Sequence, residues 1–498
     1  MCEIDPNAEK NQSKSTIYPI LFLFSAILLG GILDFWKYGP YITQDTIGYF
    51  NMIQGKGADL TTLSPFYGFI LSIFPFTLIS IFDRIIASSV LVFFLAFYLI
   101  IKISNKSEQN STSYMLVFGI SLFSWWSFRI LGSAHADSHF YIMFLLWVYL
   151  FVWKKEKSKR HFLFLCGLSA LMVWVKLNTL FLIPLLTLWV FISKEKWWIY
   201  VIGSIIISWL TYKWIFPENI LDLHLSHQVI LLPDQVSPMV LLYENISSWF
   251  QVNIGIILSD LVTERLPLPF AFSLGCLSIV LQSFYLTKYR ENYDKPIFKL
   301  LLISLVYSLF FISFQQFIGY KEINFRTLFP HLLVLSMAFW MYLIQNHRRN
   351  AILIIASLIT FHTLVGHYMI WQRNDVSSLF LAKEFDRSSE KKSIEEILGT
   401  QHQQITTDSP ERIMLSFSTM DVFQIAPENQ FIEGKNYPLN EKEKKAEYQK
   451  NITSLLKGSA VIVLFHTDSL KIELNNTPQI SSITENSMVI FYLDQSAK

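Results

Sequence analysis

Long runs of apolar residues recur along the first three quarters of the chain, separated by short polar segments. A run of about 20 residues is long enough to cross the roughly 30 Å of hydrocarbon in a bilayer. Eleven such runs lie near residues 17–36, 84–103, 113–131, 138–153, 162–176, 178–193, 197–216, 267–287, 297–317, 327–345 and 351–371. The pattern predicts a mainly α protein, a polytopic membrane bundle of about eleven transmembrane helices.

A further apolar stretch, SPFYGFILSIFPFTLISIF at residues 64–82, is also long enough to cross. If it crossed, the side assigned to every later loop would change. The segment KKEKSKRH, residues 154–161, carries five Lys/Arg and is expected in the cytoplasm, as is the basic tail 1–16. Both conditions hold only if 64–82 does not cross. Pro65 and Pro75 suit an interrupted or interfacial helix.

This assignment also places three other basic loops in the cytoplasm, which supports it. These loops lie at residues 193–196, 288–295 and 346–350. The opposite, extracytoplasmic face then receives four segments, namely a first loop at about 37–83, the HADSH turn at 135–139, a long loop at about 217–266, and everything after 372.

The hydropathy falls from residue 373 onward, and the segment 373–498 is expected to form a small extracytoplasmic α/β domain. Charged, amphipathic stretches predict helices, and short apolar runs predict strands. The expected helices are 389–401 and 440–456, and the expected strands are 412–418, 459–465 and 487–493. The transmembrane domain is expected to extend over 17–372.

The composition agrees with a membrane protein and limits the chemistry. Of the 498 residues, 52% are hydrophobic and 16% are charged, and the mean hydropathy is +0.38, which is outside the range of soluble domains. The three cysteines, Cys2, Cys166 and Cys276, lie far apart with no C-x-x-C spacing. Neither a disulfide framework nor a zinc or redox motif is therefore indicated.

Two acidic residues lie at the predicted outer ends of the spans, where polar groups are often functional. Asp45 follows the first span in YGPYITQDTIGYF, and its alternative is a solvated loop charge. Asp137 lies in the HADSH turn, and its alternative is a cap for the helix that begins near Ser138. His135 and His139 flank Asp137 and raise the alternative of a metal site, although no carboxylate cluster accompanies them.

Three cations are candidates for binding an anionic group at the same face. Lys176 interrupts ALMVWVKLNTLFLIP in the turn between two spans, where it either snorkels or binds a head group. Arg326 begins a span in GYKEINFRTLFPHLLVL and is preceded by Lys321. The planar fork of arginine suits phosphate, and the alternative for this pair is an interfacial anchor.

Taken in order, four features resemble the GT-C class of membrane glycosyltransferases. The resemblance is to the branch of protein O-mannosyltransferases and bacterial lipid A aminoarabinose transferases, which use polyprenyl-phosphate-linked sugars. The features are an Asp soon after the first span (QDTIGYF), the S-P-F-Y-G segment, an acid at the head of a later span (HADSHFYIMFLLWVYLF), and a late arginine that begins a span (FRTLFPHLLVL). They cover most of residues 17 to 345.

The resemblance implies a fold, an activity and roles for the candidate residues. The enzyme would transfer a hexosyl or pentosyl group from a polyprenyl-phosphate donor to an extracytoplasmic glycan, lipid or protein, with inversion. Asp45 would be the general base. Asp137 would be a second catalytic residue that orients the acceptor or tunes Asp45, unless it is itself the base. Lys176 and Arg326 would stabilise the phosphate leaving group, with Lys321, His135 and His139 as further substrate-binding residues.

No cofactor is expected, and a divalent metal is not expected to be obligatory, because cations can neutralise a monophosphate and no D-x-D pair stands beside Asp45. The expected location is the cell (inner) membrane. Two other classes remain open. One is a polytopic transporter, since intramembrane charges also mark transport paths, and the other is a non-catalytic scaffold for envelope assembly.

Overall fold

The computed structural model describes most of the helical part of the chain and selected parts of the rest. The described residues are 6–42, 46, 65–73, 80–106, 111–154, 158–193, 197–215, 238–258, 266–318, 325–372, 379–398, 404–407, 413, 416–417, 421–424, 429–432, 435–438, 446, 460–465, 480–485 and 488–493.

The chain forms two compact units, each of which combines separate stretches of sequence. The first, here called the bundle unit, comprises residues 1–36, 64–67 and 87–373. The second, here called the sheet unit, comprises residues 37–63, 68–86 and 374–498. Helix α1 (Pro6–Tyr38) and helix α4 (Ile81–Ser104) each pass from one unit to the other along the chain.

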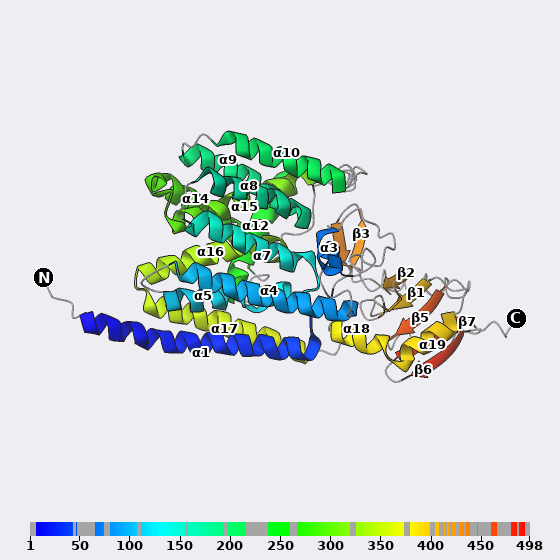
Figure 1. Cartoon of the computed structure of the whole chain (residues 1–498). Coiled ribbons are helices and arrows are strands. Elements are labelled where there is room, and N and C mark those ends of the chain that lie inside the picture. The colour runs from blue at the N-terminus through cyan, green and yellow to red at the C-terminus, as the bar shows by residue number, and fades with distance from the viewer. Residues whose placement is uncertain are drawn as a thin grey trace. The chain divides into compact units, whose positions relative to one another are not determined.

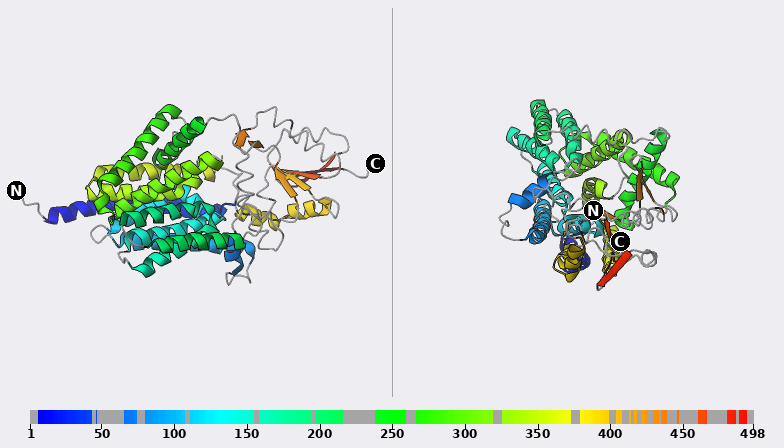
Figure 2. Two further views of the ribbon diagram at one scale, coloured as in Figure 1. Left: turned by 90° about the horizontal axis from the view of Figure 1, so that it is seen from above. Right: turned by 90° about the vertical axis from the view of Figure 1, so that its right-hand side faces the viewer.

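The bundle unit consists of long apolar helices that run alongside one another (Figures 1 and 2). Apolar residues on all sides of a helix suit a lipid environment or a protein interior, and both occur here. After α1 and α4 the helices are α5 (Ser111–Leu122), α6 (Trp125–Leu131), α7 (Ala136–Trp153), α8 (Lys159–Val175), η2 (Leu177–Phe181), α9 (Leu182–Ser193), α10 (Trp198–Ile215), α12 (Pro238–Leu258), α14 (Leu268–Lys288), η3 (Arg290–Asn292), α15 (Pro296–Ile318), α16 (Phe325–Gln345) and α17 (Arg349–Trp371).

The expectation of a mainly α, polytopic membrane bundle is confirmed. Within the described residues, seven helices are long and apolar enough to cross a membrane: Ile17–Tyr38, Phe82–Ser104, Ala136–Trp153, Leu268–Lys288, Pro296–Ser313, Leu328–Gln345 and Arg349–Trp371. The other four predicted spans also fall on helices, but these are shorter or broken, so the total of about eleven crossings stays a prediction.

One predicted span, 113–131, is not a continuous helix. It is divided into α5 and α6 at Phe123 and Ser124. The hydroxyls of Ser124 and Ser127 both donate to the main-chain carbonyl of Ser121, at 2.8 and 3.1 Å. Serine hydroxyls that take main-chain acceptors compete with the helical hydrogen bonds, which accounts for the break.

The prediction of a long loop at about 217–266 is wrong for the second half of that range. Residues Pro238–Leu258 form α12, which packs against α14, α15, α16 and α17 inside the bundle unit. Polar residues such as Asn245 and Asn253 interrupt its apolar pattern, so the sequence did not predict a membrane helix here. Asn253 is satisfied inside the protein instead, because His331 of α16 lies 2.6 Å from its Oδ1.

Within the stretch 64–82, the structure describes residues 65–73 and 80–82. This stretch contains α3 (Pro65–Ile73), whose 9 residues reach only about 13 Å at 1.5 Å per residue, and α4 begins at Ile81. A helix of this length is too short to cross the hydrocarbon core. This agrees with the prediction that 64–82 does not cross.

Buried tryptophans and serines connect the helices of the bundle unit. The indole N–H of Trp147 donates to Ser169 at 2.9 Å, that of Trp249 to Ser308 at 3.0 Å, and that of Trp340 to Ser121 at 2.7 Å. Each of these bonds joins two different helices. Small hydroxyl residues at helix contacts satisfy a buried polar group where no water is present.

The sheet unit is an α/β arrangement, as expected. Its five-stranded sheet has the order β2-β1-β5-β7-β6, and helices α18 (Leu379–Asp386) and α19 (Ser389–Leu398) precede it in the chain. Strand β1 is parallel to both neighbours, whereas β7 is antiparallel to β5 and β6. The strands are β1 (Gln404–Thr407), β2 (Asp421–Gln424), β5 (Ala460–Leu464), β6 (Ile480–Glu485) and β7 (Met488–Leu493), with a separate hairpin of β3 (Asn429–Ile432) and β4 (Lys435–Pro438).

The detailed expectations for this unit are partly confirmed. Helix α19 and strands β5 and β7 lie where they were predicted. The expected strand 412–418 is wrong, because Ile413 is helical and the Phe417 N–H donates to the Ile413 carbonyl at 3.1 Å, as in a helical turn. The expected helix 440–456 falls outside the described residues except for Ala446.

Candidate functional site

The site is built around the first turn of α7. His135 is the N-cap residue, with an extended backbone (φ −148°), and its Nδ1 accepts the Asp137 N–H at 3.0 Å. Ser138 donates its hydroxyl to the His135 carbonyl at 2.7 Å. The sequence had suggested Asp137 as the cap of a helix starting near Ser138. That is wrong, because α7 begins at Ala136 and an imidazole provides the cap.

Asp137 therefore lies within the helix, where its negative charge faces the positive end of the helix dipole. Its side chain is only 3% exposed. An ionised carboxylate buried to this extent needs a cation or several hydrogen bonds. The capping by His135 leaves the carboxylate available for such a partner.

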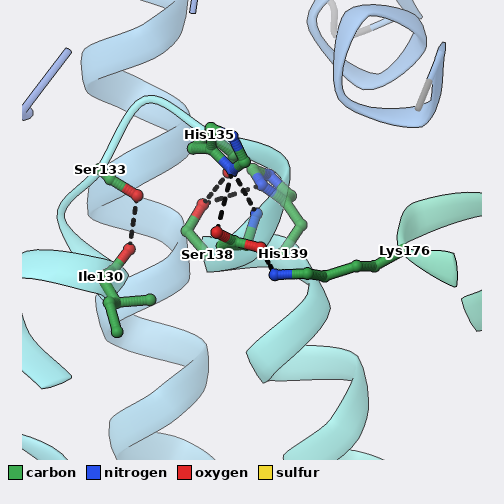
Figure 3. Close-up of polar contacts among 7 residues, drawn as sticks. Ile130, Ser133, His135, Ser138, His139 and Lys176 are labelled. Atoms are coloured by element: carbon green, nitrogen blue, oxygen red, sulfur yellow. Dashed lines mark hydrogen bonds and ion pairs between the residues drawn. The ribbon is translucent and has the colours of Figure 1, made fainter. Parts of the chain in front are cut away.

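That partner is Lys176, whose Nζ forms an ion pair with Asp137 Oδ1 (Figure 3). Lys176 lies between α8 and η2 with an extended backbone, and its carbonyl accepts the Thr179 hydroxyl at 2.7 Å. The ammonium also lies over the Phe140 ring, 5.7 Å from its centroid. The lysine side chain keeps 20% of its surface exposed, so it is the accessible member of the pair.

The charge on His135 follows from its cap. Its Nδ1 is 3.3 Å from Asp137 Oδ2, which resembles an ion pair. A main-chain N–H can only donate, however, so Nδ1 must carry a lone pair to accept from Asp137. We therefore interpret His135 as a neutral imidazole. Lys176 is then the cation that neutralises Asp137.

His139 lies one turn after His135 and connects three elements. Its Nε2 is 3.0 Å from the Ser88 hydroxyl of α4, and its Nδ1 is 3.1 Å from the Ser138 hydroxyl. The ring also makes an edge contact with Tyr67 of α3, with the centroids 5.1 Å apart. Burial raises the pKa of the Tyr67 hydroxyl, so this tyrosine stays neutral.

The structure brings together four of the seven residues singled out in the sequence, namely Asp137, Lys176, His135 and His139. Asp45 and Lys321 lie outside the described residues. Arg326 falls in the first turn of α16, as expected for a residue that begins a span, and its side chain is outside the described set. In the part of the chain that the structure describes, no three His, Cys, Asp or Glu side chains are grouped to hold a metal ion.

Sequence reasoning missed a second buried ionisable pair. Asp34 of α1, 1% exposed, has its Oδ2 3.2 Å from Nδ1 of His367 of α17, which is 4% exposed. The imidazole makes edge contacts with the rings of Trp125 and Phe128, at 5.0 and 5.4 Å. The available signal was a carboxylate within an apolar span, GGILDFWKY, since such residues are rare in membranes.

A buried lysine was also missed. Lys299, 7% exposed, is in the first turn of α15 and donates to the Phe151 carbonyl at 3.1 Å. Its ammonium lies 5.0 Å from the Trp189 ring. Phe151 is in the last turn of α7, so a cation there satisfies an unpaired helix carbonyl and complements the helix dipole. We interpret Lys299 as a structural residue.

Among comparisons with known proteins, only those with solved structures give a match, and they support the fold. No family model and no curated protein matches the chain. The crystal structure of ArnT from Cupriavidus metallidurans in the apo state, a lipid A aminoarabinose transferase, superposes with a TM-score of 0.52 at 10% identity, over 95% of this chain and 97% of that one. ArnT from the same organism bound to undecaprenyl phosphate gives a TM-score of 0.46 at 10% identity, over 96% of this chain and 98% of that one. The chain therefore has a GT-C-type fold, as the sequence predicted.

Proposed function

We propose that this chain is an integral membrane glycosyltransferase. It transfers a sugar from a polyprenyl-phosphate donor to an acceptor in the cell envelope, which is a glycan, a lipid or a protein. The observation that carries the proposal is the buried Asp137–Lys176 pair at the head of α7, within a bundle that has the fold of ArnT. A costly charge pair in a membrane protein is a reason to expect a functional site.

The reaction needs a base for the acceptor and cations for the leaving group. Asp45 accepts the proton of the acceptor hydroxyl or amine while the acceptor oxygen or nitrogen attacks the anomeric carbon. The bond from that carbon to the phosphate oxygen breaks on the opposite face, and the polyprenyl phosphate leaves with the bonding electrons. A single displacement of this kind inverts the anomeric configuration.

Lys176 is the described cation best suited to the phosphate. Its ammonium has three donors that rotate about one bond, so it can serve a carboxylate and a phosphate oxygen together. Asp137 fixes the direction of this side chain, and the first turn of α7 fixes Asp137. Arg326 and Lys321 would add further positive charge at the same phosphate.

The histidines support this arrangement from the protein side. His135 caps α7 and so sets the position of Asp137. His139 contacts α3, whose S-P-F-Y-G sequence resembles a stretch of the glycosyltransferase class. The cations replace the charge that a metal would supply, so no metal is needed in this mechanism.

The proposed location is the cell (inner) membrane, with the site and the sheet unit on the extracytoplasmic face. The basic loops are the support for this orientation, since four of them lie on the same side as the basic tail 1–16 only when 64–82 does not cross. The short helix α3 agrees with that condition.

The direct test is sugar transfer by the purified chain in liposomes. The probes are polyprenyl-phosphate hexoses and pentoses carrying a radioactive sugar, with an envelope extract as the acceptor. We expect radioactivity to move into the acceptor with the native chain and not with Asp45→Asn. If the radioactive label crosses the vesicle membrane without being transferred to the acceptor, the chain is a transporter. The buried Asp34–His367 pair would then be a candidate for part of the transport path. If neither transfer nor transport is observed, the hypothesis of a non-catalytic scaffold remains.

A further inference from the structure

The side chain of His139 is contacted by its neighbour Ser138 and by two residues that are far from it in sequence, Ser88 and Tyr67. Ser88 is 3% exposed and Tyr67 is 1% exposed, whereas the imidazole of His139 is half-buried between them. Ser88 belongs to α4, Tyr67 to α3, and Ser138 and His139 to α7. One imidazole thus connects the turn that carries Asp137 with two other helices.

The hydrogen bonds determine which nitrogen of His139 carries the proton. The single hydroxyl hydrogen of Ser138 is used on the His135 carbonyl, at 2.7 Å. Ser138 can therefore only accept from His139, which requires a hydrogen on Nδ1. In a neutral ring Nε2 then carries the lone pair and accepts the Ser88 hydroxyl at 3.0 Å.

A protonated ring does not fit these contacts as well. Its Nε2 would donate to Ser88, and the Ser88 hydroxyl hydrogen would need another buried acceptor. The neutral ring with its hydrogen on Nδ1 satisfies both serines without any further partner.

We infer that His139 and Ser88 are positioning residues for the Asp137–Lys176 site, with the imidazole fixed as the neutral Nδ1–H tautomer between Ser138 and Ser88. The pair holds α3 and α4 against the first turn of α7. The expected effect on turnover rests on the proposed function, whereas the hydrogen-bond geometry of His139 and Ser88 is independent of it. No role had been assigned to Ser88 from the sequence.

The expected consequence is a loss of turnover without a loss of donor binding. Removing the Ser88 hydroxyl takes the hydrogen-bond donor from the Nε2 lone pair of His139, and the ring can then rotate or exchange its proton. Small displacements of a site cost up to about 100-fold in rate. Both residues are proposed to position the site and not to bind the phosphate, so the affinity for the donor phosphate should change little.

The first test is ¹⁵N NMR of the full chain in nanodiscs, labelled only at histidine nitrogens. The resonances of His139 are identified by their absence in His139→Gln. We expect a protonated Nδ1 and an unprotonated Nε2 in the native chain, and proton exchange between the two in Ser88→Ala. A protonated Nε2, or two protonated nitrogens, would overturn the inference whether or not the chain is an enzyme.

The second test measures kcat and KM for Ser88→Ala, His139→Gln and Ser89→Ala. We expect a fall of about 10- to 100-fold in kcat for Ser88→Ala with KM unchanged. His139→Gln retains an acceptor near the Nε2 position and should lose less. Ser89 is equally buried at 2% exposure, so Ser89→Ala is the matched control and should be close to native.

These outcomes separate the inference from the proposed function. Native kcat in Ser88→Ala would remove the positioning role even if transfer itself is established. Absence of transfer by the native chain, together with the expected tautomer, would reject the glycosyltransferase and the effect on turnover but leave the hydrogen-bond geometry in place.

Discussion

Lys176 Nζ contacts Asp137 Oδ1, although 39 positions separate the two residues in the chain. The carboxylate begins one helix and the lysine follows the end of the next, and these helices are adjacent in the bundle unit. Lys176, which the sequence suggested as a candidate for binding a phosphate group, therefore forms an ion pair with a carboxylate of the protein. To bind a phosphate, Lys176 must either contact Asp137 and the phosphate together or exchange the carboxylate for the phosphate.

Removing the lysine should destabilise the protein. Lys176→Ala leaves the Asp137 carboxylate buried without its cation, and breaking a buried pair in this way costs about 3–5 kcal/mol. We expect a clear drop in the melting temperature of the detergent-solubilised chain, followed by fluorescence-detected gel filtration. Adding Asp137→Asn to Lys176→Ala should restore most of the loss, because the unpaired charge is gone. Lys102→Ala, at an exposed position of α4, is the control and should melt like the native chain.

The two acidic candidates should differ in their effect on transfer. Removing a general base typically costs about 10²- to 10⁴-fold in rate, so Asp45→Asn should abolish measurable transfer while expression and donor binding persist. Asp137→Asn should be milder, because its carboxylate orients Lys176 instead of accepting the proton. Transfer from a polyprenyl-phosphate sugar in liposomes measures both. Native turnover in Asp45→Asn would mean that this carboxylate is only a solvated charge.

Arg326 should show the difference between charge and shape. Lysine retains the charge of arginine but lacks the planar fork that binds two phosphate oxygens. We therefore expect Arg326→Ala to raise KM for the donor more than Arg326→Lys does. Both are measured as rate against donor concentration. If both variants behave like the native chain, Arg326 is an interfacial anchor at the start of α16.

The membrane orientation is tested by single cysteines in a background in which Cys2, Cys166 and Cys276 have been replaced by serine. A membrane-impermeant maleimide added to intact cells should label Lys56→Cys and Gln430→Cys, whereas Ser158→Cys should react only after permeabilisation. Ser158 caps α8 next to the most basic loop of the chain. Protection of residue 430 in intact cells would reverse the predicted position of the sheet unit and weaken the enzyme proposal.

The second buried pair gives a stability prediction that does not depend on enzymatic activity. His367→Leu takes the imidazole from the buried Asp34 carboxylate and should lower the melting temperature strongly. The double variant Asp34→Leu with His367→Leu should be more stable than His367→Leu alone, because two apolar residues replace a pair of polar ones. Thermal unfolding in nanodiscs compares the two. A double variant that is no more stable than His367→Leu would show that the unpaired Asp34 carboxylate carries no penalty at this position.

Several features of this protein followed from the sequence because they depend on local composition. Apolar runs of about 20 residues locate membrane helices without any tertiary information, since lipid demands internally bonded backbone over that length. The same reasoning placed α19, β5 and β7, whose patterns match their own period. The GT-C-type fold was also accessible, because the order of QDTIGYF, the S-P-F-Y-G segment, HADSH and FRTLFP is a property of the chain.

Other features were decided by the tertiary structure, because they depend on partners from distant parts of the chain. The sequence has polar residues in α12, and only the packing shows that they are satisfied by residues such as His331. It has serines near 124, and only the structure shows that their hydroxyls divide α5 from α6. Asp137 could be a cap, a base or an ion-pair partner until Lys176 is brought beside it. The helices are determined by local sequence because each satisfies its own backbone, whereas buried charges are satisfied only across helices, and that pairing is decided by the fold.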